Sequence, residues 1–266
     1  QIHGTVKIVF QPAEEEAAIG GGRHIAASGK LDDVSEIYGL HVWPELPTGQ
    51  VGLKPGALMA ASDRFYVHIK GKSTHAAQPH NGTDALVAAA HFIIDVQSLI
   101  SREMNPMDNV VCTIGLMNAG TRYNVGVEDA YLEGTCRTYR PELRDKMEAR
   151  LGEILKGLDV MFHTHSELNY VRGHSATINT PEKIDFLKKV GKAYLGEEHI
   201  MQPEFPSMCA EDFSSYLEKF PGAFFWLGTG DGNTPALHNA SFAINESILP
   251  LGITLEAAAA LEALSR

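Results

Sequence analysis

The chain has 266 residues, of which 44% are hydrophobic and 21% charged, and its formal net charge at pH 7 is −11. This length and apolar content suffice for a substantial core in either one large or two modest domains. The negative charge, with no basic stripe to offset it, argues against binding to nucleic acid. No apolar stretch approaches the roughly 20 residues of a membrane span, and the segment QIHGTVKIVF lacks the features of a signal peptide.

The three cysteines are odd in number and widely spaced, at Cys112, Cys136 and Cys209. This spacing predicts neither a disulfide framework nor a CxxC metal site. We expect all three to be packing residues and the compartment to be reducing, which favours a cytoplasmic location.

The first predicted element is a strand, TVKIVF at residues 5–10, followed at once by QPAEEE. Glu14 and Glu15 are adjacent at the predicted carboxyl end of this strand, where neighbouring side chains point in different directions. One carboxylate can then hold a metal ion while the other moves a proton. Three glutamates that open a helix also suit the positive end of its dipole, and the residues alone leave both interpretations open. A helix through residues 24–28 and a strand at 35–42 follow.

Residues 62–171 are predicted to form an inserted domain. Phe65, Val67 and Ile69 alternate with polar residues, as in a strand with one buried face, and residues 84–100 carry apolar side chains at helical spacing. Two strands, a helix that begins at Pro141 and a last strand follow, at 109–120, 129–139, 141–158 and 159–173. This order of elements is that of the split βαβ, or ferredoxin-like, α+β unit.

The flanking segments, 1–61 and 172–266, alternate between strand and helix and predict the two parts of one α/β domain. In the second part we expect helices near 183–195 and 211–220, a strand at 222–228 and a final helix after residue 250.

Three residues that can bind metal follow short apolar runs in these flanking segments. Parallel α/β sheets carry their sites at the carboxyl ends of strands, which is where Glu15, His41 and His238 are predicted to lie. A carboxylate and two imidazoles are common metal ligands, so these residues predict a metal site.

Seven short motifs occur in the order and approximate spacing of one known family: QPAEEE, GLHVWP, GKSTHAAQPH, the Asn-Val of YNVGVE, EGTCR, AEDF and ALHNASF. Together they resemble the aminoacylase/carboxypeptidase family of metallo-amidohydrolases, and within it the hippurate hydrolases and indole-acetyl-amino-acid hydrolases. The resemblance covers essentially the whole chain. It implies a zinc-peptidase-like α/β catalytic domain with an inserted ferredoxin-like domain. It also implies hydrolysis of amide bonds in N-acyl amino acids or small peptide-like substrates, with zinc or manganese as the metal.

The same resemblance implies catalytic and metal-binding roles. Glu14 is the expected general base, and Glu15, His41 and His238 are the expected metal ligands. His75 is expected to reach the active site of a partner subunit and to support the developing oxyanion. A turn histidine bonded to its own loop is an equal alternative for His75.

Four further residues receive supporting roles from the resemblance. Asn124 and Arg137 are expected to hold the carboxylate or carbonyl of the substrate, and a structural salt bridge is the alternative for Arg137. Glu211 and Asp212, in AEDF, are expected to orient the metal histidines. An acidic pair at a helix N-terminus is an equal alternative for them.

The sequence departs from the family in one respect. Members of the family carry a further N-terminal segment with a Cys and a His in a CGHD-like motif, which this sequence does not contain. Glu15, His41 and His238 can hold one zinc ion with an open position, but they are too few for two ions. Loss of strands from a parallel sheet also predicts an exposed edge that must be covered.

We therefore hold three functional hypotheses. The first is metal-dependent amide hydrolysis; the second is a catalytically silent remnant that acts through dimerisation or binding; the third is hydrolysis of esters or lactams. A homodimer through the edge strands of the inserted domain is expected, and no nucleic acid or membrane partner is expected.

Overall fold

The computed structural model describes residues 3–15 and 20–265. It divides into two compact units. Unit 1 comprises Gln1–Met59 and Ala176–Arg266, and unit 2 comprises Ala60–Ser175. Unit 2 is thus inserted into the sequence of unit 1, and the segment 62–171 that the sequence assigned to the insert lies inside unit 2.

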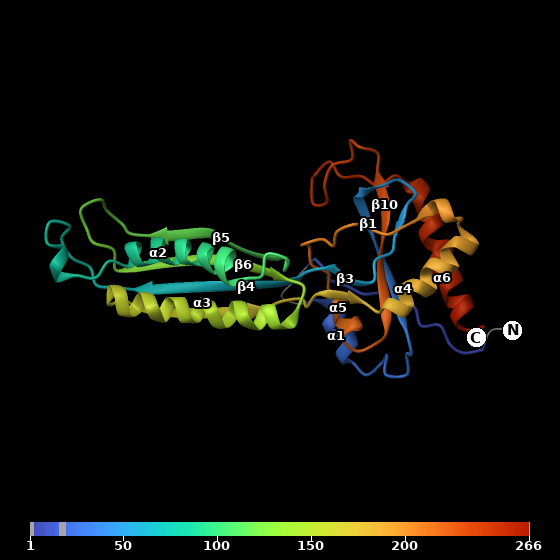
Figure 1. The fold of residues 1–266 in the computed structure, drawn as a ribbon, viewed down its shortest axis with the longest axis horizontal. Coiled ribbons are helices and arrows are strands. Elements are labelled where there is room, and N and C mark those ends of the chain that lie inside the picture. The colour runs from blue at the N-terminus through green and yellow to red at the C-terminus, as the bar shows by residue number, and fades with distance from the viewer. Residues whose placement is uncertain (1–2, 16–19, 266) are drawn as a thin grey trace. The chain divides into compact units, whose positions relative to one another are not determined.

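Unit 1 is built on a four-stranded sheet in the order β1-β10-β2-β9, and Figure 1 shows the long strands β1 and β10 of this sheet. Its strands are β1 (Ile37–Pro47), β2 (Val51–Gly52), β9 (Ile200–Met201) and β10 (Gly222–Gly230). The neighbours β1 and β10 are parallel, β10 and β2 antiparallel, and β2 and β9 parallel. A separate antiparallel pair consists of β3 (Gly56–Met59) and β8 (Thr177–Asn179). The sheet is therefore mixed, and the parallel arrangement expected from the sequence occurs in its two longest strands.

Strand β10 is buried along its whole length because side chains pack against both of its faces. Successive residues alternate between two cores, with Phe225 in one and Trp226 in the other. Helices α4 and α6 cover the first core, and α1 and α5 contribute to the second (Figure 1). The helical segments of unit 1 are α1 (Gly21–Ala27), α4 (Pro181–Tyr194), η3 (Glu197–His199), α5 (Ser214–Leu217), η4 (Glu246–Ile248) and α6 (Leu249–Ala263).

Two predictions for unit 1 are wrong. Residues 5–10 are not in a strand, and Val6, Ile8 and Phe10 are 55%, 75% and 90% exposed. A strand needs a neighbour for its N–H and C=O groups, and none of the described strands pairs with this segment. Glu14 and Glu15 consequently lie in a turn rather than at a strand end. The helix expected at 211–220 is reduced to the four residues of α5.

Unit 2 has the element order strand, helix, strand, strand, helix, strand. The elements are β4 (Ala61–Lys70), α2 (Ala85–Ser98), β5 (Val110–Ala119), β6 (Asp129–Thr138), α3 (Pro141–Phe162) and β7 (His165–Arg172), with the short turns η1 (Pro79–Asn81) and η2 (Leu99–Glu103). The sheet order is β5-β6-β4-β7, and all three neighbouring pairs are antiparallel. This is the split βαβ arrangement that the sequence predicted.

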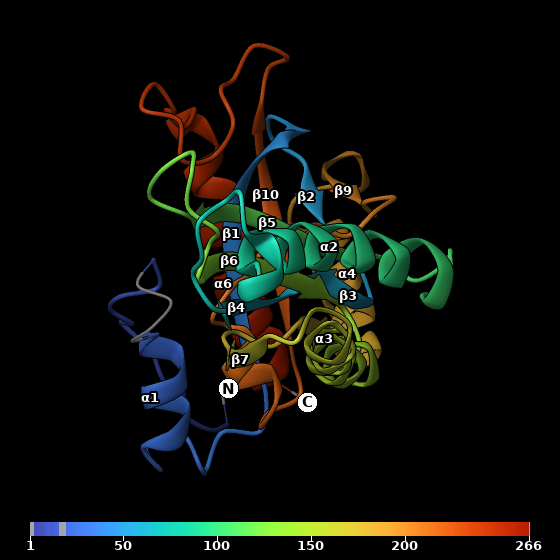
Figure 2. The same cartoon turned by 90° about the vertical axis from the view of Figure 1, so that its left-hand side faces the viewer.

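The core of unit 2 lies between its sheet and the helices α2 and α3, which Figure 2 shows on the same side of the strands. Phe65, Val67 and Ile69 are fully buried there, as their alternation predicted. Asp84 caps α2 by accepting hydrogen bonds from the backbone N–H groups of the helix. The predicted strand at 159–173 begins too early, because the apolar period of α3 continues to Phe162.

A buried carboxylate ties the strands and helix of unit 2 together. Asp63 of β4 is only 1% exposed and accepts hydrogen bonds from Arg144 Nε at 2.8 Å, Tyr170 Oη at 2.8 Å and Gly173 N at 3.1 Å. Because these donors come from α3, from β7 and from the residue after β7, Asp63 fixes both elements against the central strand β4.

The segment Ala85–Glu103, which joins α2 and η2, has the length and apolar content of a membrane span. Ala88, Phe92 and Val96 on its inner side are fully buried in the core of unit 2. Such burial is what a core helix of a globular domain shows, so length and composition are weak evidence for a membrane here.

Candidate metal and catalytic centre

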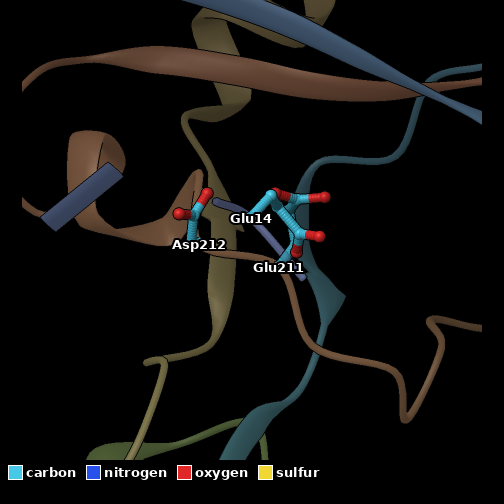
Figure 3. A group of neighbouring side chains, drawn as sticks. All are labelled: Glu14, Glu211 and Asp212. Carbon is cyan, nitrogen blue, oxygen red and sulfur yellow. The ribbon is translucent and has the colours of Figure 1, made fainter. Parts of the chain in front are cut away.

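Three carboxylates from distant parts of the sequence meet in unit 1. Glu14, Glu211 and Asp212 each offer an oxygen, and these oxygens lie within 4.8 Å of one another. Figure 3 shows Glu14 and Glu211 beside each other and Asp212 on the other side of Glu14. Glu211 and Asp212 are 5% and 0% exposed, and Glu14 is half-buried. Buried carboxylates this close together repel one another unless a proton or a cation lies between them.

Burial, and then this repulsion, raise the pKa values of the two glutamates. Burial, and then the negative charge of Glu14, raises the pKa of Glu211 to about 8. Burial, and then the charges of Glu15 and Asp212, raises the pKa of Glu14 above its ordinary value. A raised pKa makes a carboxylate a better proton acceptor, which is the property required of a general base.

Asp212 is held in place by neutral donors. Gln11 Nε2 donates to both of its carboxylate oxygens, at 2.7 and 2.9 Å, and Gly22 N donates at 2.8 Å. Tyr216 Oη in turn donates to Gln11 Oε1 at 2.8 Å. Gly22 also allows close packing, since a Cβ there would lie 2.7 Å from the carbonyl oxygen of Asp212. Asp212 therefore positions the turn that carries Glu211.

Gln11 was missed by the sequence interpretation. It stands in the QPAEEE motif, three residues before Glu14, and this closeness was the only signal available. Its partners Asp212 and Tyr216 lie 201 and 205 positions further along the sequence, so no local pattern could reveal the contact.

The predicted ligands Glu15 and His238 are neighbours. His238 Nε2 lies 3.6 Å from Glu15 Oε2, and the two side chains are 75% and 74% exposed. His238 has a left-handed backbone with φ of 65°, which is uncommon for a residue with a Cβ.

His41 lies on β1 and has its ring oriented by the backbone. Its Nδ1 is 2.6 Å from the carbonyl oxygen of Val42, so Nδ1 carries the proton and donates it. Nε2 then keeps a free lone pair. Among the described residues, Glu14, Glu211 and Asp212 form the group whose side chains lie close enough together to hold a metal ion. None of the predicted ligands Glu15, His41 and His238 belongs to this group.

The candidate residues of unit 2 lie in two separate places. His75 and Asn124 lie on neighbouring loops, because His75 forms a β-bridge with Val125 and Ala76 N donates to the Asn124 carbonyl at 3.1 Å. Arg137 is half-buried in the middle of the sheet, opposite Val111 of β5. The structure thus brings His75 and Asn124 together within unit 2 and leaves Arg137 on the strand β6.

The ring of His75 is also oriented by the backbone, in the opposite sense to His41. Ala77 N donates to His75 Nδ1 at 3.1 Å, so Nδ1 is the unprotonated nitrogen. In the neutral ring the proton is then on Nε2. This tautomer can donate a hydrogen bond from its outer nitrogen.

Comparison with known proteins gives a match to the model of peptidase family M20/M25/M40 over residues 1–262. The chain belongs to this family. The resemblance to metallo-amidohydrolases predicted from the seven motifs is confirmed, and so is the α/β fold class.

Among relatives of known description, the chain is 35% identical over 248 residues to an N-acetyl-L-cysteine deacetylase of Bacillus subtilis, covering 93% of this chain and 58% of the relative. It is 37% identical over 253 residues to an N-acetyldiaminopimelate deacetylase of Listeria innocua, covering 92% and 65%. The chain therefore spans about three fifths of the length of these relatives.

Solved structures agree. A dinuclear metal-binding peptidase of the M20 family from Bacillus subtilis superposes with a TM-score of 0.81 at 32% identity, over 96% of this chain and 64% of that one. An aminohydrolase of methicillin-resistant Staphylococcus aureus gives a TM-score of 0.88 at 29% identity, over 96% and 65%. The M20 fold is thus present throughout the described residues of this chain.

Proposed function

We propose that this M20 family chain serves the metal-dependent hydrolysis of amide bonds in N-acyl amino acids. The observation that carries the proposal is the cluster of Glu14 with the buried Glu211, in which a half-buried carboxyl group has a raised pKa next to the pair Glu15 and His238. The deacetylase relatives, which act on N-acetyl amino acids by their descriptions, support the substrate class.

The donor set fits a divalent metal ion. The excess negative charge of Glu14, Glu211 and Asp212 calls for a cation. His41 donates its Nδ1–H to a backbone carbonyl, which is the arrangement that commonly orients a metal-binding imidazole and leaves Nε2 free to bind. Carboxylates and imidazoles together suit zinc or manganese. We propose Glu15, His41 and His238 as the ligands of one ion; a second ion would need ligands in addition to these three.

Such an ion, when bound, supplies Lewis-acid activation of the scissile carbonyl and of the attacking water. Glu14 takes the proton of this water on its carboxylate and later delivers it to the leaving amine, a task for which its raised pKa is suited. Burial, and then the charges of Glu15 and Asp212, keep that pKa raised.

We assign the remaining predicted residues to the substrate. His75, whose Nε2 carries the proton, reaches the active site of a partner subunit and donates a hydrogen bond to the developing oxyanion there. Asn124, on the adjoining loop, binds the carbonyl, and Arg137 binds the carboxylate through its planar fork.

We also propose a homodimer through unit 2. The outer strand β5, VVCTIGLMNA, has no charged residue, whereas the other edge, β7, carries several. Charges on an edge strand discourage pairing with another chain, and β5 lacks this protection. Val87 and Ile94 of α2 are 44% and 61% exposed and add apolar surface to the same unit. In sedimentation, Met117→Lys on β5 should yield monomers and the matched change Val171→Lys on β7 should not; a monomeric wild type would contradict the proposal.

A cytoplasmic location is proposed on the three free thiols alone.

Hydrolysis is tested with N-acetyl, N-benzoyl and indole-acetyl amino acids in the presence of Zn²⁺, Mn²⁺ or Co²⁺. We expect turnover that Glu14→Gln reduces by at least about 10²-fold, the usual contribution of a general base. Glu182→Gln, an exposed glutamate at the start of α4, is the control and should retain full activity. Folded protein that binds metal but turns over none of these amides, while it cleaves the corresponding esters, would favour the altered-substrate hypothesis instead.

A further inference from the structure

Two cysteines in unit 2 face each other across neighbouring strands. Cys112 of β5 and Cys136 of β6 are direct partners in the antiparallel ladder. The Cys136 thiol donates a hydrogen bond to Cys112, with the two sulfur atoms 3.6 Å apart. Both are free thiols, and both side chains pack against the core between the sheet and its helices.

The backbone at this pair already meets the requirement of a disulfide. Directly opposed residues of an antiparallel pair have Cα atoms roughly 4.5 or 5.5 Å apart, and disulfides bridge Cα separations of about 4.4–6.8 Å. The sulfur atoms must approach by about 1.5 Å to reach the bond length of about 2.05 Å. Rotation of the two side chains can supply this movement without a change of strand register.

We propose that Cys112 and Cys136 are a redox modification site, a dithiol that hydrogen peroxide closes into an intramolecular disulfide. The Cys112 thiolate attacks one peroxide oxygen, the O–O bond breaks, and the products are a sulfenic acid on Cys112 and, after protonation, water. Cys136 sulfur then attacks Cys112 sulfur, the S–O bond breaks, and the hydroxyl leaves as water with the proton of Cys136. Two thiols lose two electrons in total, and one peroxide is reduced to two waters.

The environments of the two thiols set this order. Cys112 is half-buried on the outer strand, within reach of a small oxidant, whereas Cys136 is 1% exposed. The hydrogen bond with Cys112, and then burial, raises the pKa of Cys136, which therefore remains protonated and does not react first. The proposed dimer uses the backbone edge of β5, while the Cys112 side chain points to the core, so dimerisation does not occupy the thiol.

Closure would constrain one particular hairpin. Cys112 and Cys136 are 24 positions apart, and the loop between β5 and β6 that they enclose carries Asn124. A disulfide around a loop of this size is expected to lower the unfolding constant of unit 2 on the order of 100-fold. Oxidation would thereby stiffen the support of a proposed substrate-binding loop.

The test exposes the reduced full chain to excess hydrogen peroxide under native conditions and maps its cysteines by non-reducing peptide mass spectrometry. Most molecules should contain the bond between Cys112 and Cys136, and dithiothreitol should reverse it. Cys209 is exposed and serves as an internal control for the oxidant. Oxidised Cys209 together with two intact thiols at 112 and 136 would overturn the proposal.

Two variants test the order of the steps. In Cys136→Ala, dimedone should trap Cys112 as a sulfenic acid, and in Cys112→Ser, Cys136 should remain a thiol. Trapping of Cys136 in the second variant, or a disulfide that forms only in urea, would refute the mechanism. A rise in the urea midpoint of the oxidised wild type, absent from both variants, is the expected stability readout. None of these readouts depends on hydrolytic activity.

Discussion

Units 1 and 2 each bury a carboxylate, and they treat it in opposite ways. Asp63 of unit 2 is 1% exposed and receives hydrogen bonds from a guanidinium, a phenol and a backbone amide. Glu211 of unit 1 is 5% exposed, accepts one backbone hydrogen bond from Phe213 at 3.3 Å, and has the carboxylates Glu14 and Asp212 beside it. The charge in unit 2 is compensated by the fold, whereas the charge in unit 1 is left for a proton or a cation. This difference separates a structural carboxylate from a functional one.

The largest expected effect is the removal of the compensated charge. Asp63→Ala leaves the Arg144 guanidinium, which is 13% exposed, without its carboxylate, and should destabilise unit 2 by about 3–5 kcal/mol. Urea unfolding, monitored by a probe in unit 2, measures this loss of stability. The matched control Asp129→Ala removes a carboxylate that is 61% exposed and paired with His68, and should cost less than about 1 kcal/mol. Equal losses in both variants would show that Asp63 is no anchor.

The uncompensated carboxylate of Glu211 should, in contrast, destabilise the fold when it is charged. In protein freed of metal by EDTA, the pKa of Glu211 is raised from 4.5 to about 8, so its contribution to stability is full below pH 4.5 and is lost as the pH rises through 8. Glu211→Gln should abolish this loss and be more stable than the wild type at pH 9 by a few kcal/mol, because each unit of difference in pKa is worth about 1.4 kcal/mol. Parallel stability curves of the two proteins from pH 4 to pH 9 would contradict the comparison.

Metal should stabilise one unit only. Zn²⁺ or Mn²⁺ at a free concentration 100 times Kd should add about 2.7 kcal/mol to the unfolding free energy of the unit that binds it. Hydrogen exchange should localise this gain to unit 1. His41→Ala should reduce the gain, whereas His68→Ala, in unit 2, should preserve it. Protection that rises equally in both units would mean that the ion binds elsewhere or to several sites.

The sequence predicted unit 2 well because its elements depend on local patterns. The alternation of Phe65, Val67 and Ile69 and the helical spacing after Asp84 are each contained within one element, and the observed strand and helix follow them. The exception was the last strand, which was predicted to begin at residue 159. The residues just before His163 fit both a helical and an alternating pattern, and they belong to α3.

Unit 1 was predicted less completely because its features depend on distant partners. The apolar alternation at 5–10 is a strand pattern, yet no described strand pairs with it. Glu14 and Glu211 were both singled out, but their approach to within 4.8 Å depends on tertiary contacts across nearly the whole sequence. Glu211 was assigned to orient the metal histidines, and only the structure places it against the proposed base.

The smallest expected effect concerns the two oriented histidines, one in each unit. His41 should carry its proton on Nδ1 and His75 on Nε2, because a carbonyl faces the first ring and a backbone N–H faces the second. A single hydrogen bond contributes about 1 kcal/mol, which favours each tautomer about fivefold. Imidazole ¹⁵N shifts at a pH where both rings are neutral would show opposite patterns in one spectrum, so each ring serves as the control for the other. Ala77→Pro removes the amide that faces His75 and should shift the pattern of His75 alone. A proton on Nδ1 of both rings would deprive His75 of its proposed part in oxyanion binding, and a proton on Nε2 of both rings would contradict the proposed orientation of His41 for metal binding.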